Sequence, residues 1–350
     1  LCTKNLPDVA VVPSEHFNVK LYNGNGSNKN VSGIGFQPDF TWIKMRSASM
    51  DHMLMDAVRG ATKNLYANGS DAEGSIGLTS FNTDGFTTQS NVKVSTSGGN
   101  YVAWNWKANG SGSSNTDGDV TSTVSANVDA GFSIVTYTGN GSNINVGHGL
   151  SKAPEIVIVK VRNDTGGWYI NLKNIPSQSA GVDMVGALNT SDAINGMNVG
   201  QWYFGSTAPT SSVFRVQNKD DVGENGDTHV AYCFHSVDGY SSIGSYVGNG
   251  NADGTFVYTG FRPAFVMMKD VVNANSWVII DSKRDTYNQS LKRLYPNSSE
   301  AEYTASDDTI IDIVSNGFKH RYAGGNANQS NDNVIYIAFA ETPFKYSNAR

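Results

Sequence analysis

Two short stretches contain the carboxylates that could carry out acid–base chemistry. The stretch "HMLMDAVRG" places Asp56 three residues before Arg59, and "WVIIDSKRD" places Asp281 three residues before Arg284. A glycosidase needs two carboxylates about 5 to 10 Å apart in a cleft, but no second acid recurs beside either aspartate. We therefore interpret these four residues as two structural ion pairs at strand ends, and we expect the protein not to be an enzyme.

A third copy of this stretch, "WYINLKN", supports the ion-pair interpretation. We align Asn171 with the two aspartates and Asn174 with the two arginines, so that both charges are missing from this copy together. Joint loss is typical of a structural bridge, because a partly buried charge without its partner is costly.

Aromatic rings beside acidic loops are the remaining candidates for chemistry, because an exposed ring can stack on a sugar. We expect "GQWYFG" to be a strand with Trp202 and Tyr203 on opposite faces. The acid-rich loop "NKDDVGENGD" spans 218–227. The candidate ligand-binding residues are Trp168, Trp202, Tyr203, Asp220 and Asp221, in a site formed by loops such as 163–168, 218–227 and 322–333.

Three alternatives stay open for these residues. The rings of "GQWYFG" could belong to a core or an interface, and loop 218–227 could be a loose calcium site or a plain exposed hairpin loop. Trp277 and His52 occupy the position of Trp168 in the other copies, and this recurrence favours packing.

The cysteines and histidines predict neither a metal site nor a cofactor. Cys233 lies in the apolar run "HVAYCF", which is typical of a small buried thiol, and Cys2 is far from it in the sequence. The six histidines lack the spacing of metal ligands; they are His16, His52, His148, His229, His235 and His320.

The elements that position these residues occur three times along the chain. The triplet "GNG" begins at Gly24, Gly139 and Gly248, and each copy leads to a proline and a strand-like run with a lysine six residues beyond it: Pro38 to Lys44, Pro154 to Lys160 and Pro263 to Lys269. Each copy then has a phenylalanine and an aromatic-rich closing strand: Phe86, Phe214 and Phe318, with strands centred on Ala103, Ala231 and Ala338. The sequence is therefore a repeat of about 110 residues.

Short runs rich in Val, Ile, Phe, Tyr and Trp between Gly, Asn, Asp and Ser clusters predict strands, and we expect helices to be short or absent. The fold class is therefore all-β, with three tandem antiparallel β-sandwich modules that are jelly-roll-like. The Gly-Asn-Gly turn is expected to close a hairpin. We place the modules at 1–108, 131–236 and 237–350, with a Gly/Ser/Thr/Asn-rich linker at 109–130 that bends near 109–119 and whose second half could add an edge strand.

Composition excludes two classes of function. The formal net charge is -6 with 25 Lys plus Arg and no basic run, which argues against nucleic-acid binding. No apolar stretch is long enough to suggest a membrane span. The first residue is Leu1 rather than Met, so we expect a mature or trimmed part of a longer product.

The stretches "LCTKNLP", "YNGNGSNKNVSGIGFQPDFTWIK", "DAVRGATKNLY", "LTSFNTDGF" and "YVAWNWKANG" resemble repeated modules of virion proteins of tailed bacteriophages. Such proteins, from marine and freshwater phages, are labelled tail-fibre or structural proteins. The resemblance is dense across 1–150 and thins to the repeat landmarks beyond. It implies a virion protein, in which "LCTxNLP" often follows an N-terminal lectin-like domain.

The function expected from these observations is a non-enzymatic virion fibre or appendage protein, a structural spacer whose loops recognise a host-surface glycan. Its partners would be further copies of itself, other virion proteins and that glycan, and its location the virion surface. The alternative is a secreted bacterial adhesin or lectin that binds glycans directly.

Overall fold

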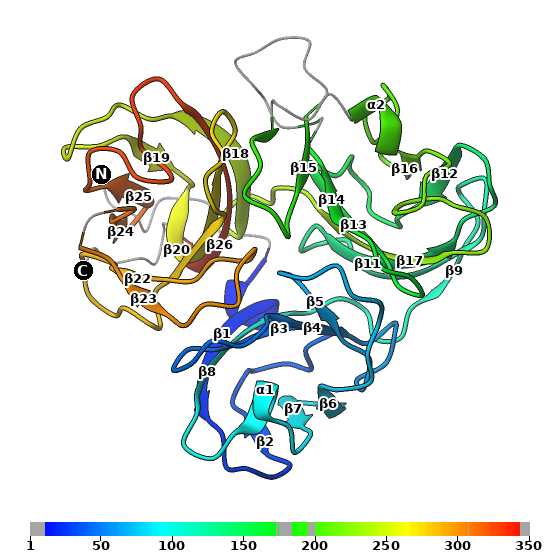
Figure 1. The fold of residues 1–350 in the computed structure, drawn as a ribbon, viewed down its shortest axis with the longest axis horizontal. Helices are drawn as coiled ribbons and strands as arrows, with labels where there is room; N and C mark the ends of the chain where they lie inside the picture. The colour runs from blue at the N-terminus through cyan, green and yellow to red at the C-terminus, as the bar shows by residue number, and fades with distance from the viewer. Residues whose placement is uncertain (1–10, 173, 175–183, 195–199, 307, 344–350) are drawn as a thin grey trace.

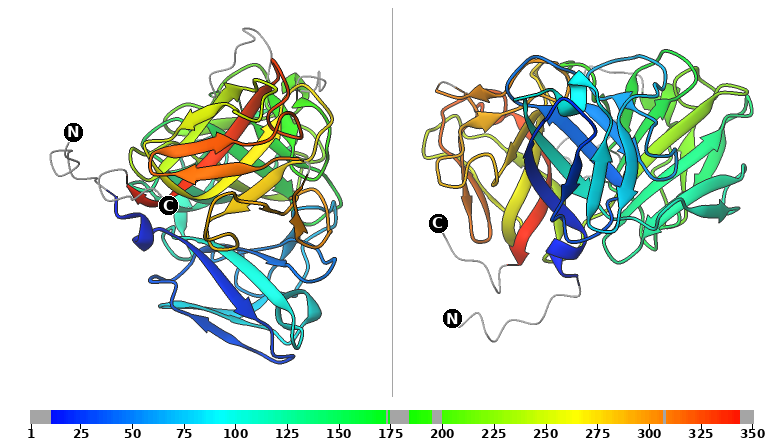
Figure 2. Two further views of the ribbon diagram at one scale, coloured as in Figure 1. Left: turned by 90° about the vertical axis from the view of Figure 1, so that its left-hand side faces the viewer. Right: turned by 90° about the horizontal axis from the view of Figure 1, so that it is seen from below.

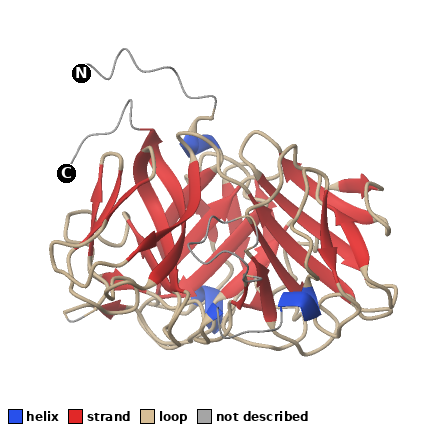
Figure 3. Cartoon of the chain, turned by 90° about the horizontal axis from the view of Figure 1, so that it is seen from above, coloured by secondary structure: helices blue, strands red, loops and turns tan. Residues whose placement is uncertain are grey.

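The computed structural model describes residues 11–172, 174, 184–194, 200–306 and 308–343, so that the motif "LCTKNLP" lies outside the described residues. Within this part of the chain nearly all regular structure is antiparallel β. The helices described are a 3-10 turn, η2 (Pro13–Glu15), and two four-residue α-helices, α1 (Val92–Ser95) and α2 (Gly200–Tyr203). None of the described helices could cross a membrane. The all-β class and the shortness of the helices were therefore predicted correctly (Figures 1 and 3).

The first repeat forms a large sheet and a small sheet. The large sheet has the order β1-β8-β3-β4-β5, with bounds Phe17–Asn23, Asn100–Trp106, Phe40–Met45, Met53–Asp56 and Leu65–Tyr66. The small sheet has the order β2-β7-β6, with bounds Asn30–Ser32, Gly85–Thr88 and Leu78–Asn82.

The second repeat has the same arrangement with two added strands. Its large sheet has the order β15-β14-β13-β17-β11-β10-β9, with bounds Val185–Ala187, Trp168–Asn171, Ile156–Val161, Thr228–Phe234, Phe132–Thr138, Ser122–Asn127 and Ser113–Asn115. Its small sheet pairs β12 (Ile144–Gly147) with β16 (Val213–Val216). The segment 109–130 thus contributes β9 and β10 to this sheet. The edge-strand alternative anticipated β10, in the second half of the segment, whereas β9 lies in the first half, where a flexible linker was expected.

The third repeat repeats the pattern again. Its large sheet has the order β18-β26-β20-β21, with bounds Ser241–Val247, Asn333–Pro343, Phe261–Asp270 and Val278–Asp281. The small sheet has the order β19-β25-β24, with bounds Phe256–Tyr258, Gly317–His320 and Ile311–Val314. A two-stranded hairpin pairs β22 (Lys292–Arg293) with β23 (Tyr303–Thr304).

Each large sheet is buried on both faces. One face packs on the small sheet of its own repeat and encloses a separate core, to which the landmark residues Phe86, Phe214 and Phe318 contribute. The other face packs against the large sheets of the other two repeats in a fourth, central core. Because of this double burial, β3, β13 and β20 are buried at every position rather than at alternate positions.

The three repeats surround a common axis (Figure 1). Trp106, Phe234 and Phe339 occupy the same register position, because they pair with Phe40, Ile156 and Phe265, each two residues after the landmark proline. Their rings meet one another in all three combinations, with centroids 5.5 to 6.4 Å apart. Only about 20 Å³ of space remains at this centre, lined by apolar side chains, so the axis is a packed core and not a ligand site.

The Gly-Asn-Gly turn connects two layers of a repeat and does not close a hairpin. β11 belongs to the large sheet and β12 to the small sheet, so the hairpin prediction is wrong. A Cβ on Gly139 would lie 2.1 Å from the carbonyl oxygen of Glu224, and Gly141 has a φ of +75°. Asn140 accepts a hydrogen bond from the amide of Ser142 across the turn.

The tyrosine before each turn holds the loop that faces it. The hydroxyls of Tyr22, Tyr137 and Tyr246 donate to the carbonyls of Val94, Val222 and Ala327 at 2.7 to 2.9 Å. The repetition of Tyr-x-Gly-Asn-Gly in the sequence is thus explained by a fixed contact between two loops.

One sequence landmark is displaced by two residues in the third repeat. The three landmark lysines fix the register of the closing strands: they pair with Val102, Val230 and Ile335. The next residue along each strand is Ala103, Ala231 or Tyr336, so these three share one position. Ala338 is therefore two positions further along its strand than the landmark requires. Both residues still face the third repeat's own core.

Each repeat has two ends, which we call near and far. At the near end the first strand begins and the closing strand ends; at the far end lie the Gly-Asn-Gly turns. The η2 turn contacts β26, and Phe17 stacks on Phe339, so the first and last described segments lie side by side at the near end. Figures 2 and 3 show η2 at one end of the molecule and α1 at the other.

Candidate functional site

The pair Asp56 and Arg59 lies in the seam between the first and second repeats. Both side chains are fully buried, and their ion pair is completed by the hydroxyl of Tyr232, which donates to Asp56 Oδ2 at 2.8 Å. Glu73 bridges Arg59 to Arg162 of the second repeat at 3.2 and 2.9 Å. Burial disfavours the charge of Arg59, but Asp56 and its neighbours raise the pKa of the guanidinium above its usual range.

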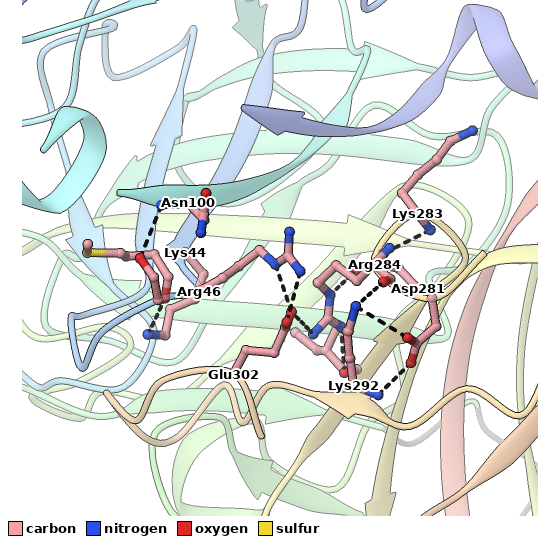
Figure 4. Close-up of polar contacts among 12 residues, drawn as sticks. Lys44, Arg46, Asn100, Asp281, Lys283, Arg284, Lys292 and Glu302 are labelled. Atoms are coloured by element: carbon pink, nitrogen blue, oxygen red, sulfur yellow. Dashed lines mark hydrogen bonds and ion pairs between the residues drawn. The ribbon is translucent and has the colours of Figure 1, made fainter. Parts of the chain in front are cut away.

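The pair Asp281 and Arg284 occupies the equivalent place between the third and first repeats. Trp104 of the first repeat donates its indole N–H to Asp281 Oδ2 at 3.1 Å, in the position that Tyr232 has in the other seam. Glu302 lies between Arg284, at 3.3 Å, and Arg46, at 2.8 Å (Figure 4). The four residues predicted to be structural are therefore buried ion pairs at repeat boundaries, out of reach of a substrate.

The seam between the second and third repeats has no such network among its described residues. Pairing of β14 with β13 places Leu172, not Asn171, at the position of the two aspartates, so the alignment on Asn171 is wrong by one residue. The arginine position is then 175, an isoleucine outside the described residues, and Asn174 donates instead to the carbonyls of Pro154 and Pro209.

Every other member of the network is also apolar in this seam. Ile194 occupies the position of Glu73 and Glu302. Each of these residues lies three positions after a serine whose carbonyl crosses the seam: Ser191, Ser70 and Ser299. Val271 replaces Arg46 and Arg162, and Ile337 replaces Trp104 and Tyr232. All three, with Leu172, belong to the central core.

Trp168 is part of a second set of contacts, which two of the seams share. Its indole N–H donates to the carbonyl of Tyr66 in the first repeat, and Trp277 donates to Ala187 in the second, both at 2.8 Å. Trp168 is fully buried, which contradicts its predicted contact with a ligand and favours the packing alternative.

Three lysines act in the same way. The ammonium groups of Lys44, Lys160 and Lys269 donate to the carbonyls of Ser299, Ser70 and Ser191 across the three seams at 3.1 to 3.3 Å. No described carboxylate pairs with them, and burial lowers the pKa of each to about 8.

Trp202 and Tyr203 lie on the surface of the second repeat, in α2 and not in the expected strand. Trp202 is 59% exposed, with the Lys219 ammonium 5.2 Å from its ring centroid. Tyr203 stacks on Tyr169, whose centroid is 3.7 Å away, and donates its hydroxyl to the Tyr169 hydroxyl at 2.8 Å. Phe204 enters the core of the repeat, so Trp202 is the ring that solvent reaches.

Asp220 and Asp221 have different surroundings within one loop. Asp220 is exposed. Asp221 accepts the amide N–H of Gly167 at 2.8 Å and thereby ties loop 218–227 to loop 163–168. Burial raises the pKa of the Asp221 carboxyl, against the opposing effects of that hydrogen bond and of Lys160.

A polar recess opens beside α2. It has a volume of about 370 Å³ and is lined by Gly205, Ser206, Thr207, Arg215 and Gln217. The backbone of Gln217 donates to the carbonyl of Tyr203 at 2.8 Å, which joins the recess to the exposed ring. We call Trp202, Tyr203, Lys219 and this recess the α2 surface. Arg215, Gln217 and Tyr169 were missed by the sequence analysis, which had no signal for a helix here.

The predicted loops share the far end. Loops 163–168 and 218–227 meet through Asp221 and also through Asn163, which donates to Asp227 at 3.0 Å. Loop 322–333 packs on the turn of its own repeat, where the amide of Gly248 donates to Asp332. The structure therefore joins two of the three loops in one surface.

The metal and thiol candidates occupy the interior. All the histidines except His16 are buried, and burial raises the pKa of the Cys233 thiol. Among the described residues no cluster of His, Cys, Asp and Glu could hold a metal ion.

The sequence model of one family matches residues 12–343, and that family is described as a domain of unknown function, DUF7483. The chain belongs to the DUF7483 family. The match covers all three repeats and the central core between them. Comparison with curated proteins gave no match, and comparison with solved structures gave none.

Proposed function

We propose that this DUF7483 protein is a non-enzymatic fibre or appendage protein of a tailed-phage virion. It serves there as a homo-oligomeric spacer whose far end contacts a glycan on the host surface. Its three repeats act as jelly-roll-like sandwich modules joined into one rigid head. The resemblance of the first 150 residues to phage virion modules is the basis for proposing that the particle is a tailed-phage virion.

One observation carries the recognition part of the proposal. The first and last described segments lie side by side at the near end, while the exposed Trp202 and the joined loops lie at the far end. A neighbouring domain would attach at the near end and leave the far end free. Polar loops on a rigid scaffold are common places for binding, and weak contacts gain strength when several copies engage one surface.

The α2 surface fits a glycan in its chemistry. The Trp202 ring offers an apolar face for stacking, and Lys219, Arg215 and Gln217 supply hydrogen-bond donors beside it. The direct adhesin or lectin alternative uses the same surface and differs only in the particle that bears it.

The test combines location with binding. Labelled antibodies should place the protein on the surface of intact phage particles in electron micrographs, and the purified protein should bind host cells. Trp202→Ala should reduce this binding, while Tyr287→Ala, a matched control because Tyr287 is 80% exposed elsewhere, should not. Binding to cells without any label on particles would favour the lectin alternative. No binding, with infectivity unchanged in loop variants, would reject the recognition role.

A further inference from the structure

The third repeat contains a recess that the proposed function does not use. It lies beside the hairpin of β22 and β23 and has a volume of about 640 Å³, within the range of ligand pockets. The residues that line it are Arg293, Tyr295, Glu300, Ala301, Glu302, Tyr303 and Asp308.

Arg293 is the unusual group in this recess. Its side chain is 1% exposed, and its guanidinium lies 4.7 Å from the Tyr303 ring centroid and 6.0 Å from that of Tyr295. Nη1 is 2.8 Å from Asp308 Oδ2, but neither Nε nor Nη1 makes a well-directed hydrogen bond with the described residues. A buried guanidinium with unused donors is costly, unless an acceptor from outside completes it.

Asp308 does not require Arg293. Its carboxylate accepts the amide of Thr309 at 2.6 Å and both the amide and the side chain of Asn326 at 2.8 Å. The loop that bears Asp308 is therefore held by its own neighbours, and the arginine is not explained by the need to fix that loop.

The first repeat shows the same hairpin without the recess residues. Asn64 and Gly74 stand there in place of Arg293 and Tyr303, and their backbones pair in the same way. The segment between Asn64 and Gly74 is as long as the one between Arg293 and Tyr303. It places Glu73 in the first–second seam, just as the other segment places Glu302 in the third–first seam. Arg293 and Tyr303 are thus dispensable for the hairpin and for the seam.

The groups of the recess specify a class of ligand. Arg293 supplies donors, the carboxylates of Glu300 and Glu302 supply acceptors, and Tyr303 is 42% exposed and offers an apolar ring edge or face. The charge of Glu302 is neutralised by Arg46 and Arg284. The remaining charges that line the recess are the carboxylates of Glu300 and Asp308 and the guanidinium of Arg293, which together are net negative, so an anionic ligand is disfavoured. A neutral polyhydroxyl ring can use the donors, the acceptors and the aromatic surface together.

We propose that this recess binds one neutral sugar unit, with the sugar against Tyr303 and a hydroxyl accepting from Arg293. The site lies in the third repeat and is separate from the α2 surface.

The experiment titrates the whole protein with methyl glycosides of glucose, galactose, mannose and N-acetylglucosamine, followed by ligand-observed NMR. At least one should bind, and R293N/Y303G, which restores the first-repeat residues, should weaken binding by at least about tenfold. Tyr287→Ala, which changes an exposed tyrosine outside the lining of the recess, should leave this binding unchanged. Tyr303→Ala serves as a second variant, because its side chain is partly exposed and its loss should also weaken binding while the protein stays folded.

Three results would overturn the proposal: none of the four glycosides binds, R293N/Y303G binds as the wild type does, or methyl glucuronoside binds more tightly than its neutral counterpart. Host-cell binding separates this site from the proposed function. If R293N/Y303G loses the sugar but still binds cells, the recess binds sugar and the α2 surface accounts for attachment. If the protein never binds cells yet binds a glycoside through Arg293, only the proposed function fails.

Discussion

Two seams of this molecule are ionic and one is apolar, although the same strands meet in all three. The first–second seam contains Asp56, Arg59, Glu73, Arg162 and Tyr232 in one buried network. At the corresponding described positions, the second–third seam has Leu172, Ile194, Val271 and Ile337. All described members change together, which indicates that a buried charge network is replaced as a unit or not at all.

The largest effect is expected from breaking one ionic seam with a single change. Asp56→Leu leaves Arg59 buried without its principal counter-charge and should lower the free energy of unfolding by about 3 to 5 kcal/mol. Urea unfolding followed by tryptophan fluorescence measures it, with a single transition because the repeats share a core. The matched change Leu172→Asp should cost a similar amount in the apolar seam. A loss under about 1 kcal/mol in both would remove the case for coupled seams.

The next prediction converts the first–second seam to the apolar type. The variant D56L/R59I/E73I/R162V/Y232I should have a free energy of unfolding equal to the wild type or up to about 4 kcal/mol higher, because the removed charges no longer pay for desolvation. The same urea experiment gives the value. Summing the losses of the five single variants should overestimate the effect greatly. Strict additivity would show that the network does not act as a unit.

The lysines common to all seams should give a pH dependence. Burial lowers the pKa of Lys160 to about 8, from an ordinary 10.5. Between these values the unfolded chain holds a proton that the folded chain lacks, so the free energy of unfolding from this lysine rises with pH. Lys160→Met should flatten the profile between pH 8 and 10.5, whereas the exposed Lys152→Met should not. Parallel profiles for Lys160→Met and the wild type would contradict the buried position of this group.

The smallest effect belongs to the rim of the ionic seams. The side chains of Arg46 and Glu302 are 17% and 12% exposed, so their pair is partly screened. Arg46→Met should cost about 1 kcal/mol and its effect should shrink in high salt, unlike that of Asp56→Leu. Thermal unfolding at two salt concentrations tests this. A cost equal to that of Asp56→Leu would mean that the network has no distinct rim.

Sequence patterns were sufficient for the strands, the repeat and the pairing of each Asp with its Arg. They failed where a shift of one residue changes the face of a strand. Asn171 and Leu172 are neighbours, and successive residues of a strand point to opposite faces. Only the pairing of β14 with β13 shows that Leu172 is the one that enters the seam. The segment "GQWYFG" fits both a short strand and a helical turn, so periodicity alone could not place Trp202.

The closed arrangement was missed for a different reason. β3, β13 and β20 are buried on both faces, but a strand's sequence does not say which surface covers the second face. The segment 109–130 looked like a linker because it is rich in Gly, Ser and Thr, and its pairing as β9 and β10 depends on the edge that β11 offers.

The repeats contact one another head to tail, each lysine meeting the serine carbonyl of the preceding repeat, and the third contact returns to the first repeat. A contact of this kind builds an endless filament when its rotation does not close. Here the rotation closes after three units of one chain, so the surfaces that make this contact are all used within the chain. Because one joint is apolar and two are charged, the three units also have a fixed order around the ring, and a repeat placed out of that order would mismatch a joint.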